Sequence, residues 1–298
     1  MTMPPAGFSI VVPTYNRPER LAECVASFSA LQYDRERFEV VIVDDGSPRI
    51  EEVRGALSPF FDRIALRLLE QSHAGPAAAR NLGAGAARHE FIAFTDDDCR
   101  VDPGWLSALA GQFAAHPGGL LGGRTVNALT ENACAEASQA LVDFLLKYFI
   151  AKGAPFFASN NLAVARETFE RVGGFDLHFP LAGGEDREFC ARYHRAGCPL
   201  VYAEGAVVAH YHALTVRRFL RQHYNYGRGA YCYRRVHAAR GGPEVGFERW
   251  RFYLDLVRYP LSAKGIDKRG RVTLLMFATQ VANATGFFAE KLTRPNPE

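Results

Sequence analysis

The chain has 298 residues, of which 48% are hydrophobic and 22% charged, so it can bury a full core and is neither disordered nor fibrous. Its net charge of +3 is unevenly spread: residues 1–214 carry a net −7, whereas residues 215–298 hold 16 Lys and Arg against 6 Asp and Glu. This division predicts an acidic body joined to a basic tail that faces phosphates or an anionic surface.

Four apolar runs alternate with helical patterns in the first hundred residues. The runs are rich in β-branched residues and end in turn residues, as buried strands do. Strands that alternate with helices predict an α/β fold in which helices flank a mainly parallel sheet. The expected strands are Phe8–Val12, Phe38–Val43, Ile64–Leu69 and Phe91–Thr95, and the expected helices begin at Arg17 and cover Pro76–Arg88.

The rest of the chain is less regular. We expect helices over Ala133–Lys152 and Glu185–Ala196, with a loop at Phe156–Asn161 between them. From about Leu214 the sequence becomes basic and aromatic, and apolar residues recur at helical spacing over 274–292. These patterns predict a basic, helical C-terminal extension.

Three adjacent carboxylates, Asp96, Asp97 and Asp98, follow the fourth expected strand. Carboxylates this close repel one another unless a cation neutralises them. Asp96 and Asp98 are alternate residues, so both can point toward one ligand. An all-oxygen ligand set favours Mg²⁺ or Mn²⁺, which also bridges diphosphate oxygens. The alternative is a solvated acidic turn, but the position at the carboxyl end of a strand favours a ligand site.

A second acidic pair, in Asp44-Asp45-Gly46-Ser47, follows the second expected strand. Asp-Gly is a common turn signal. A carboxylate here can equally accept hydrogen bonds from a nucleobase N–H or a ribose hydroxyl. These residues alone leave turn and binding site equally open.

Ordered motifs in the first 212 residues resemble glycosyltransferase family 2. The resemblance covers about residues 8–212 and implies a GT-A fold and inverting sugar transfer from a nucleotide-sugar donor. The motifs are Ser9-Ile-Val-Val-Pro-Thr-Tyr-Asn16, Val41-Ile-Val-Asp-Asp-Gly-Ser47, Gly75-Pro-Ala-Ala-Ala-Arg-Asn81 and Phe94-Thr-Asp-Asp-Asp98, followed by the acceptor-side segments Gly173-Gly-Phe-Asp176 and Gly184-Glu-Asp-Arg-Glu-Phe189. We therefore divide the chain into a catalytic domain, 1–214, with nucleotide-binding (about 1–119) and acceptor-side (about 120–214) parts, and an extension, 215–298.

The resemblance also implies roles for single residues. The first strand's end would form a wall of the nucleotide pocket, Asp45 would contact the base, and Arg80 would approach the nucleotide. Asp98 would be the direct metal ligand of the D-x-D pair, and Cys99 stands where many relatives carry another acid. The expected nucleotide-sugar contacts are Pro13, Thr14, Tyr15, Asp45, Arg80, Asp96, Asp97 and Arg228, and the expected metal ligands are Asp98, Asp96 and His210.

Asp186 is the candidate general base. Inversion at an anomeric carbon needs a carboxylate that takes the proton from the attacking hydroxyl. Asp186 follows the Gly183-Gly184 pair in the acceptor-side segment. The alternative is that Glu185 and Asp186 only complement the N-terminal dipole of a helix.

His210 and His212 follow an apolar run and would share one face of an extended strand. In similar enzymes a histidine at this point completes the metal site, and we favour His210 over His212. Further on, Arg228 lies in a basic, aromatic segment that either covers the donor diphosphate or lines the acceptor groove. The alternative for that segment is a basic surface helix.

The apolar stripe over 274–292 lies beside a basic run, 264–271. Gln280, Asn283 and the short apolar length argue against a spanning helix. The stripe can lie on an anionic membrane surface or pack on the protein's own body. The six cysteines form no C-x-x-C pair and Met1–Gly7 carries no secretory pattern, so we expect a cytoplasmic protein with reduced thiols, peripheral on the inner face of the membrane.

These observations predict a glycosyltransferase that depends on Mn²⁺ or Mg²⁺. Its donor would be UDP-, GDP- or dTDP-linked, its acceptor a saccharide or lipid-linked saccharide, and it would bind no nucleic acid. A sugar-1-phosphate nucleotidyltransferase is the alternative enzyme, but it would carry a Gly-rich basic loop where this chain has Pro13-Thr-Tyr-Asn16. A non-catalytic nucleotide-sugar-binding module would not need Asp186 as well as the metal carboxylates.

Overall fold

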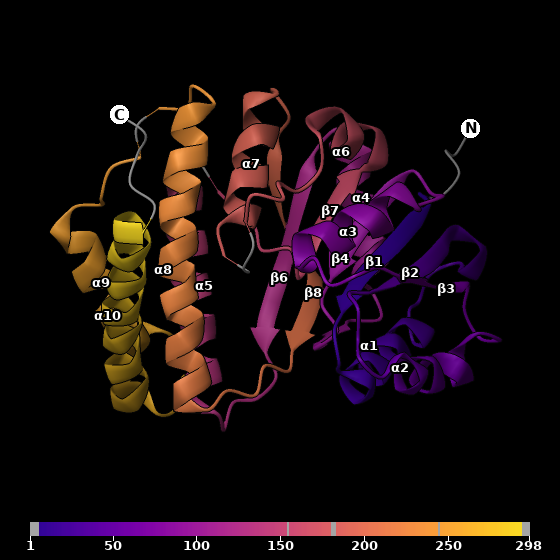
Figure 1. The fold of residues 1–298 in the computed structure, drawn as a ribbon, viewed down its shortest axis with the longest axis horizontal. Helices are drawn as coiled ribbons and strands as arrows, with labels where there is room; N and C mark the ends of the chain where they lie inside the picture. Colours follow the sequence, from indigo (N-terminus) through magenta and orange to yellow (C-terminus); the bar gives the residue numbers. More distant parts are fainter. Residues whose placement is uncertain (1–5, 154, 180–182, 244, 294–298) are drawn as a thin grey trace. The chain divides into compact units, whose positions relative to one another are not determined.

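The computed structural model describes residues 6–153, 155–179, 183–243 and 245–293 (Figure 1). The chain divides into two compact units, each made of three segments. Unit 1 is Met1–Val126, Phe156–Pro180 and Phe189–Tyr211; unit 2 is Asn127–Pro155, Leu181–Glu188 and His212–Glu298. Of the segment considered for a secretory signal, residues 1–5 lie outside the described residues.

The described part of unit 1 forms an eight-stranded sheet with the strand order β3-β2-β1-β4-β7-β6-β8-β5. Strands β1, β2, β3 and β4 pair in parallel, whereas β7 runs antiparallel to β4 and β6, and β5 antiparallel to β8. The expected α/β fold is confirmed, with an antiparallel second half. The strands are β1 Phe8–Thr14, β2 Phe38–Asp44, β3 Leu66–Glu70, β4 Phe91–Thr95, β5 Cys99–Val101, β6 Leu120–Asn127, β7 Asn161–Ala165 and β8 Leu200–His210.

Helices cover both faces of the parallel strands because successive side chains of a strand point to opposite faces. Ile10 and Val12 belong to the core that includes Leu21 of α1. On the other face α3 lies against β1 at Gly83, where an added Cβ would overlap the side chain of Val11. The helices of unit 1 are α1 Pro18–Ser29, α2 Ile50–Leu57, α3 Pro76–Gly85, α4 Trp105–Ala115, α6 Arg166–Val172 and most of α7 Glu185–Arg195, with short 3-10 turns at Arg35–Arg37 and Ser58–Phe60.

A buried amide connects the antiparallel strands. Asn161, at the start of β7, donates from Nδ2 to the carbonyl oxygens of Arg124 in β6 (3.1 Å) and Ala206 in β8 (2.9 Å). Its Oδ1 accepts the indole N–H of the buried Trp105 at 2.9 Å. One side chain therefore holds β6, β7, β8 and α4 together, at a position where the sequence led us to expect the end of a loop.

Unit 2 is helical, as the prediction of a helical extension required. Its core brings together α5, α8, α9 and α10, with Leu141, Phe219, Leu256 and Met276 buried among them. The helices α8 and α10 run side by side (Figure 1). An added Cβ at Gly286 of α10 would overlap the carbonyl oxygen of Tyr224 in α8, so this close approach requires glycine. The helices are α5 Ala133–Ala151, α8 Val216–Ala239, α9 Trp250–Ser262 and α10 Arg269–Thr293, with the first turn of α7.

The two faces of α10 differ. Val272, Met276 and Phe287 are buried on one face. On the other face, each large apolar residue between 274 and 292 is more than half exposed. By length and composition alone α10 is long and apolar enough to cross a membrane: 18 of its residues have a mean hydropathy of 1.3, and 28% of that stretch is buried. The exposed large apolar residues of α10 are Leu274, Phe277, Val281, Phe288 and Leu292.

Candidate nucleotide and metal site

The carboxyl ends of β1, β2 and β4 lie at one edge of the sheet because the three strands are adjacent and parallel. Thr14, the last residue of β1, donates its hydroxyl to Asp97 at 2.8 Å. The amide of Asp45, just beyond β2, donates to the carbonyl oxygen of Thr14 at 2.9 Å. The residues expected at the strand ends are therefore neighbours. Pro13 is buried within β1, and Tyr15, the first residue beyond β1, is exposed.

Asp44, the last residue of β2, and Asp45, which follows it, have different partners. Asp44 forms the turn, because its carboxylate accepts the amides of Gly46 (3.1 Å) and Ser47 (2.8 Å). Gly46 adopts φ +80°, a conformation that glycine favours. Asp44 therefore forms the turn, and the binding role of Asp45 stays a prediction.

Asp45 is buried and holds the loop that precedes α3. Its Oδ1 accepts Gln71 Nε2 at 2.7 Å and the amide of Ala74 at 2.8 Å. Its Oδ2 accepts the amide of Gly75 at 2.9 Å and lies 2.9 Å from His73 Nδ1. Four donors are about as many as a carboxylate accepts, so any base contact by Asp45 must share or replace one of them.

His73 is a candidate site residue that the sequence did not indicate. Its ring lies 4.5 Å from the ring of Tyr15, at 35° between planes, beside Asp45. Tyr15 is exposed, and so is most of the His73 side chain. Two neighbouring exposed rings, one of them in contact with a buried carboxylate, offer a stacking surface for a planar group. A single His in a loop carries no pattern that would have revealed this pairing.

The three aspartates after β4 have different partners. Asp96 pairs with the buried Arg80 at 2.7 Å, and that guanidinium also lies 5.7 Å from the ring of Phe175. Asp97 accepts Thr14 Oγ1 and lies 3.0 Å from Arg17 Nη1. Burial raises the pKa of Asp97 to about 6, against the attraction of the Arg17 charge. The D-D-D motif is therefore a partnered, largely buried cluster, and the alternative of a solvated turn does not describe it.

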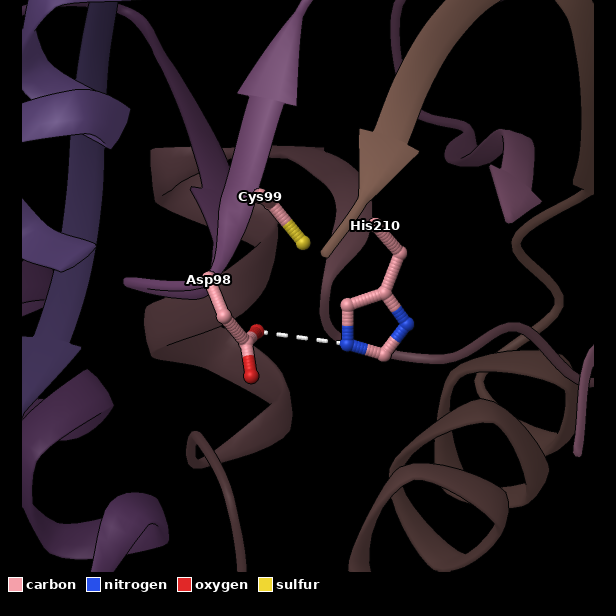
Figure 2. A group of neighbouring side chains, drawn as sticks. All are labelled: Asp98, Cys99 and His210. Carbon is pink, nitrogen blue, oxygen red and sulfur yellow. Dashed lines mark ion pairs between the residues drawn. The ribbon is translucent and has the colours of Figure 1, made fainter. Parts of the chain in front are cut away.

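Asp98 lies beside His210, as Figure 2 shows. Its Oδ1 is 3.2 Å from His210 Nε2, and its Oδ2 is 3.3 Å from Arg17 Nη1 and 3.5 Å from Arg20 Nη1. The antiparallel pairing of β5 with β8 produces this neighbourhood, because it sets Cys99 opposite His210. Asp98 is 8% exposed, so these partners offset the cost of burying its charge.

One group of possible metal ligands stands out among the described residues. The ligand atoms of Asp98, Cys99 and His210 lie within 4.8 Å of one another (Figure 2). A carboxylate oxygen and an imidazole nitrogen fit Mn²⁺, whereas a thiol is a soft ligand. Burial and the neighbouring aspartates raise the pKa of the Cys99 thiol well above its usual range, which disfavours the thiolate that a metal needs.

Asp96, a predicted ligand, and His212, the alternative to His210, are not in this group. Asp96 pairs with Arg80 and is not in the Asp98–His210 group, so its direct ligation stays a prediction. His212 lies two residues beyond the end of β8 and belongs to unit 2, whereas His210 is in the unit that holds Asp98. The geometry of unit 1 therefore favours the choice of His210.

Asn81, the partner of Arg80 in the R-N pair, holds part of the expected acceptor-side segment. Its Nδ2 donates to the carbonyl oxygen of Phe175, and its Oδ1 accepts the amide of Phe175, both at 2.8 Å. Gly174 adopts φ +64° beside it. This pairing ties the loop after α6 to α3.

The start of α7, which carries Asp186, belongs to unit 2. Glu185 accepts the amide of Gly183 at 2.6 Å, and the buried Glu188 forms an ion pair with Arg240. An added Cβ at Gly229 of α8 would overlap the carbonyl oxygen of Gly183, so the loop lies directly on α8. The turn that presents Asp186 is thus fixed by unit 2.

Arg228, predicted to contact the donor, pairs with the buried Glu290 of α10 at 2.6 Å between Nε and Oε2. This ion pair joins α8 to α10 and raises the pKa of Arg228 further, mainly through the hydrogen bond to Glu290. Arg228 therefore has a task within unit 2, and its contact with a donor stays a prediction.

Family descriptions and known proteins match most of this chain. The family described as Glycosyl transferase family 2 matches residues 9–173, and N-terminal domain of galactosyltransferase matches residues 144–215. Pre-mycofactocin glycosyltransferase of Mycobacterium tuberculosis is 32% identical over 239 residues, 76% of this chain and 48% of that protein. Chondroitin synthase of Escherichia coli is 30% identical over 243 residues, 68% of this chain. The chain spans 34% of the length of the chondroitin synthase and about half the length of the pre-mycofactocin glycosyltransferase.

Solved structures show the same fold. Mannosyltransferase PcManGT from Pyrobaculum calidifontis, in complex with GDP-Man and Mn²⁺, aligns with a TM-score of 0.61 at 19% identity over 99% of this chain and 77% of that one. TarS 1–349 of S. aureus, in complex with UDP-GlcNAc, aligns with a TM-score of 0.56 at 15% identity over 96% and 91%. The protein has the GT-A fold of glycosyltransferases. The chain belongs to glycosyltransferase family 2.

Proposed function

We propose that the protein transfers a sugar from a nucleotide-sugar donor to an acceptor hydroxyl with inversion, and that it needs Mn²⁺ or Mg²⁺. The observation that carries this proposal is the contact of Asp98 with His210, 3.2 Å apart, at the edge of the sheet where Asp45 also lies. A nitrogen and a carboxylate ligand beside further carboxylates suit a cation that also binds diphosphate.

On the donor side, we assign the stacking surface of Tyr15 and His73 to the nucleobase. Asp45 holds the loop on which His73 stands, and shares an oxygen with the base. Arg80 and Asp96 neutralise each other beside the metal carboxylates. Because PcManGT was solved with GDP-Man and TarS with UDP-GlcNAc, both guanine and uracil donors are candidates.

For the chemistry, Asp186 takes the proton from the acceptor hydroxyl, while Asp98 and His210 hold the cation. When bound, that cation acts as a Lewis acid toward the leaving diphosphate. Arg17 and Arg20 supply further positive charge at the same edge of the sheet. The acceptor is a saccharide or a lipid-linked saccharide.

A membrane surface is the partner we propose for unit 2. The exposed apolar residues of α10 form one face of a helix in a part of the chain with a net charge of +10. An apolar face with surrounding Lys and Arg suits shallow, reversible contact with anionic lipid. A cytoplasmic enzyme in such contact would meet lipid-linked acceptors.

Nucleotide binding and donor hydrolysis test the proposal. UDP, GDP or dTDP with Mn²⁺ should raise the melting temperature, because a ligand of the folded state stabilises it. Hydrolysis of the matching donor should stop with a chelator and in Asp98→Ala, and continue in Glu90→Gln, which removes an exposed carboxylate at the opposite end of β4. Full activity of Asp98→Ala in the presence of chelator would refute the metal assignment.

A further inference from the structure

We propose that Arg17 and Arg20 form a switch and exchange partners: before the donor arrives they pair with Asp98, the predicted metal ligand, and with its neighbour Asp97, and they move to the donor diphosphate when the cation binds Asp98. This proposal rests on the proposed function, because it needs a metal ion at Asp98 and a diphosphate beside it. According to the proposal, the two arginines make the affinity for the metal depend on the donor, and the affinity for the donor depend on the metal.

Both arginines stand at the start of α1 and reach the same carboxylates. Arg17 Nη1 lies 3.0 Å from Asp97 Oδ1 and 3.3 Å from Asp98 Oδ2, and Arg20 Nη1 lies 3.5 Å from that same Oδ2. The other oxygen of Asp98 faces His210 at 3.2 Å. Both oxygens of the predicted metal ligand are therefore engaged by cationic or ring nitrogens.

Metal ligation and the arginine pairs compete for one oxygen. A divalent cation on Asp98 Oδ2 would stand beside two guanidinium charges in a partly buried place, where like charges repel strongly. At least one arginine must leave before Asp98 accepts a metal through Oδ2. The metal alone should therefore bind weakly.

The exposure of the arginines decides which of them can leave. The side chain of Arg17 is 51% exposed and that of Arg20 34%, so both guanidinium groups can swing into solvent without opening the core. The Arg80 side chain is 5% exposed and is held between Asp96 and Phe175. Arg80 is the fixed cation of the site, and Arg17 and Arg20 are the movable ones.

A nucleoside diphosphate gives the displaced arginines a new partner. Its phosphates carry negative charge on several oxygens, and guanidinium groups bind such oxygens in pairs with defined geometry. The switch therefore opposes binding of the metal alone and favours binding of metal and diphosphate together. By linkage, each ligand then raises the affinity for the other by the same factor, and such factors are about fivefold or more.

Mn²⁺ titrations with and without nucleotide test the switch. Free Mn²⁺ is followed by electron paramagnetic resonance in wild type, Arg17→Gln, Arg20→Gln and Arg17→Lys. We expect Arg17→Gln to bind Mn²⁺ alone about fivefold or more tightly than wild type, and to lose most of the increase that UDP, GDP or dTDP causes. Arg17→Lys keeps the charge and should keep the weak binding of Mn²⁺ alone.

Arg88→Gln is the control for net charge. Arg88 is exposed and precedes β4 at the end away from Asp96, so screening should leave Mn²⁺ binding unchanged. Equal or weaker Mn²⁺ binding by both Arg17→Gln and Arg20→Gln, with melting temperatures near wild type, would overturn the switch. If none of UDP, GDP and dTDP raises the Mn²⁺ affinity of wild type, the proposed function fails instead, while the comparison without nucleotide still decides whether the arginines compete with the metal.

Discussion

His223 of α8 is fully buried and lies between two rings. The ring of Phe219 is 4.5 Å away and that of Tyr226 is 5.4 Å away, and Ser138 Oγ lies 3.4 Å from His223 Nε2. Burial, and secondarily the nearby His212, lower the pKa of His223 to about 4. The folded protein therefore holds this imidazole neutral over a pH range in which an unfolded chain would protonate it.

This difference predicts an acid-labile unit 2. Between about pH 6.5 and 4, His223 is protonated in the unfolded state and neutral in the folded state. The free energy of unfolding therefore falls as the pH falls through that range. The loss should reach about 3 kcal/mol, and His223→Phe should remove most of it. Urea unfolding at pH 4.5 and 7.5, read by hydrogen exchange of α8 after a pulse at one common pH, measures it. His116→Gln, at an exposed site in unit 1, is the control; an unchanged slope in His223→Phe would contradict the assignment.

The proposed role of Asp186 is that of the general base, which a substitution of the carboxylate alone can test. Asp186→Asn keeps the size of the side chain and removes the base, so donor binding should stay near wild type. Turnover should fall on the order of 10²-fold or more. Nucleotide titration and initial rates separate the two effects. Loss of nucleotide binding with an unchanged residual rate would show that Asp186 has another role.

For single residues, the sequence indicated which charged side chains belong to the site, but it did not indicate most of the residues they contact. D-D-D after an apolar run predicted a charged cluster at a strand end, and the structure places Asp98 beside His210 there. His73 and Asn161 were missed because their contacts join residues distant in sequence, which hydrophobic periodicity does not record. The pairing of Asp98 with Arg17 and Arg20, at the start of α1, was missed for the same reason.

Among the helices, α8 and α10 make a close contact that depends on two glycines, Gly227 of α8, which faces the backbone of Asn283, and Gly286 of α10. Gly286 faces the backbone of Tyr224, whereas Gly270 at the start of α10 is exposed and has no atom near an added Cβ. Gly286→Ala should therefore destabilise unit 2 by about 1–3 kcal/mol. Gly270→Ala should be neutral or stabilise it by up to about 1 kcal/mol, because alanine favours a helix.

Chemical unfolding of the two alanine variants checks this prediction. Both substitutions add one methyl group to the same helix. The difference between the free energies of unfolding of the two variants therefore measures the packing of α10 on α8. Equal stability of the two proteins would mean that the helices move apart at little cost.

The strands fall into two groups: those whose sequences carry a strand pattern and those whose sequences do not. β1, β2 and β4 are mostly apolar and buried along their whole length, and their ends were predicted within two residues of those observed. β5 has three residues and β6 contains the pair Gly122-Gly123, so neither carries an extended pattern. Their strand structure comes from pairing with β8 and β7, which only the folded chain provides.

At the scale of the whole molecule, the exposed face of α10 leads to a test of membrane contact. Wild type should float with anionic vesicles at low salt, and added salt should release it, because each Lys or Arg near the surface contributes about 1 kcal/mol that salt screens. Leu274→Ser, Phe277→Ser and Phe288→Ser together should abolish flotation and leave the fold intact, since all three side chains are exposed.

Phe61→Ser, an exposed aromatic residue of unit 1, is the matched control and should float like wild type. Neutral vesicles separate the apolar from the electrostatic contribution. Flotation of the triple variant at the wild-type level, or none by wild type at low salt, would remove the membrane surface as a partner of α10.

The two units interleave along the chain, and this has a consequence for synthesis on the ribosome. Helix α5 emerges with the segment Asn127–Pro155, but its partners in unit 2 follow only from His212 onward. At about 5–20 residues per second, α10 is complete on the order of ten seconds after α5. During that time the side of α5 that carries Ala137, Ala140 and Leu141 has no core to enter, so this nascent chain should be a client of chaperones that bind short apolar helices.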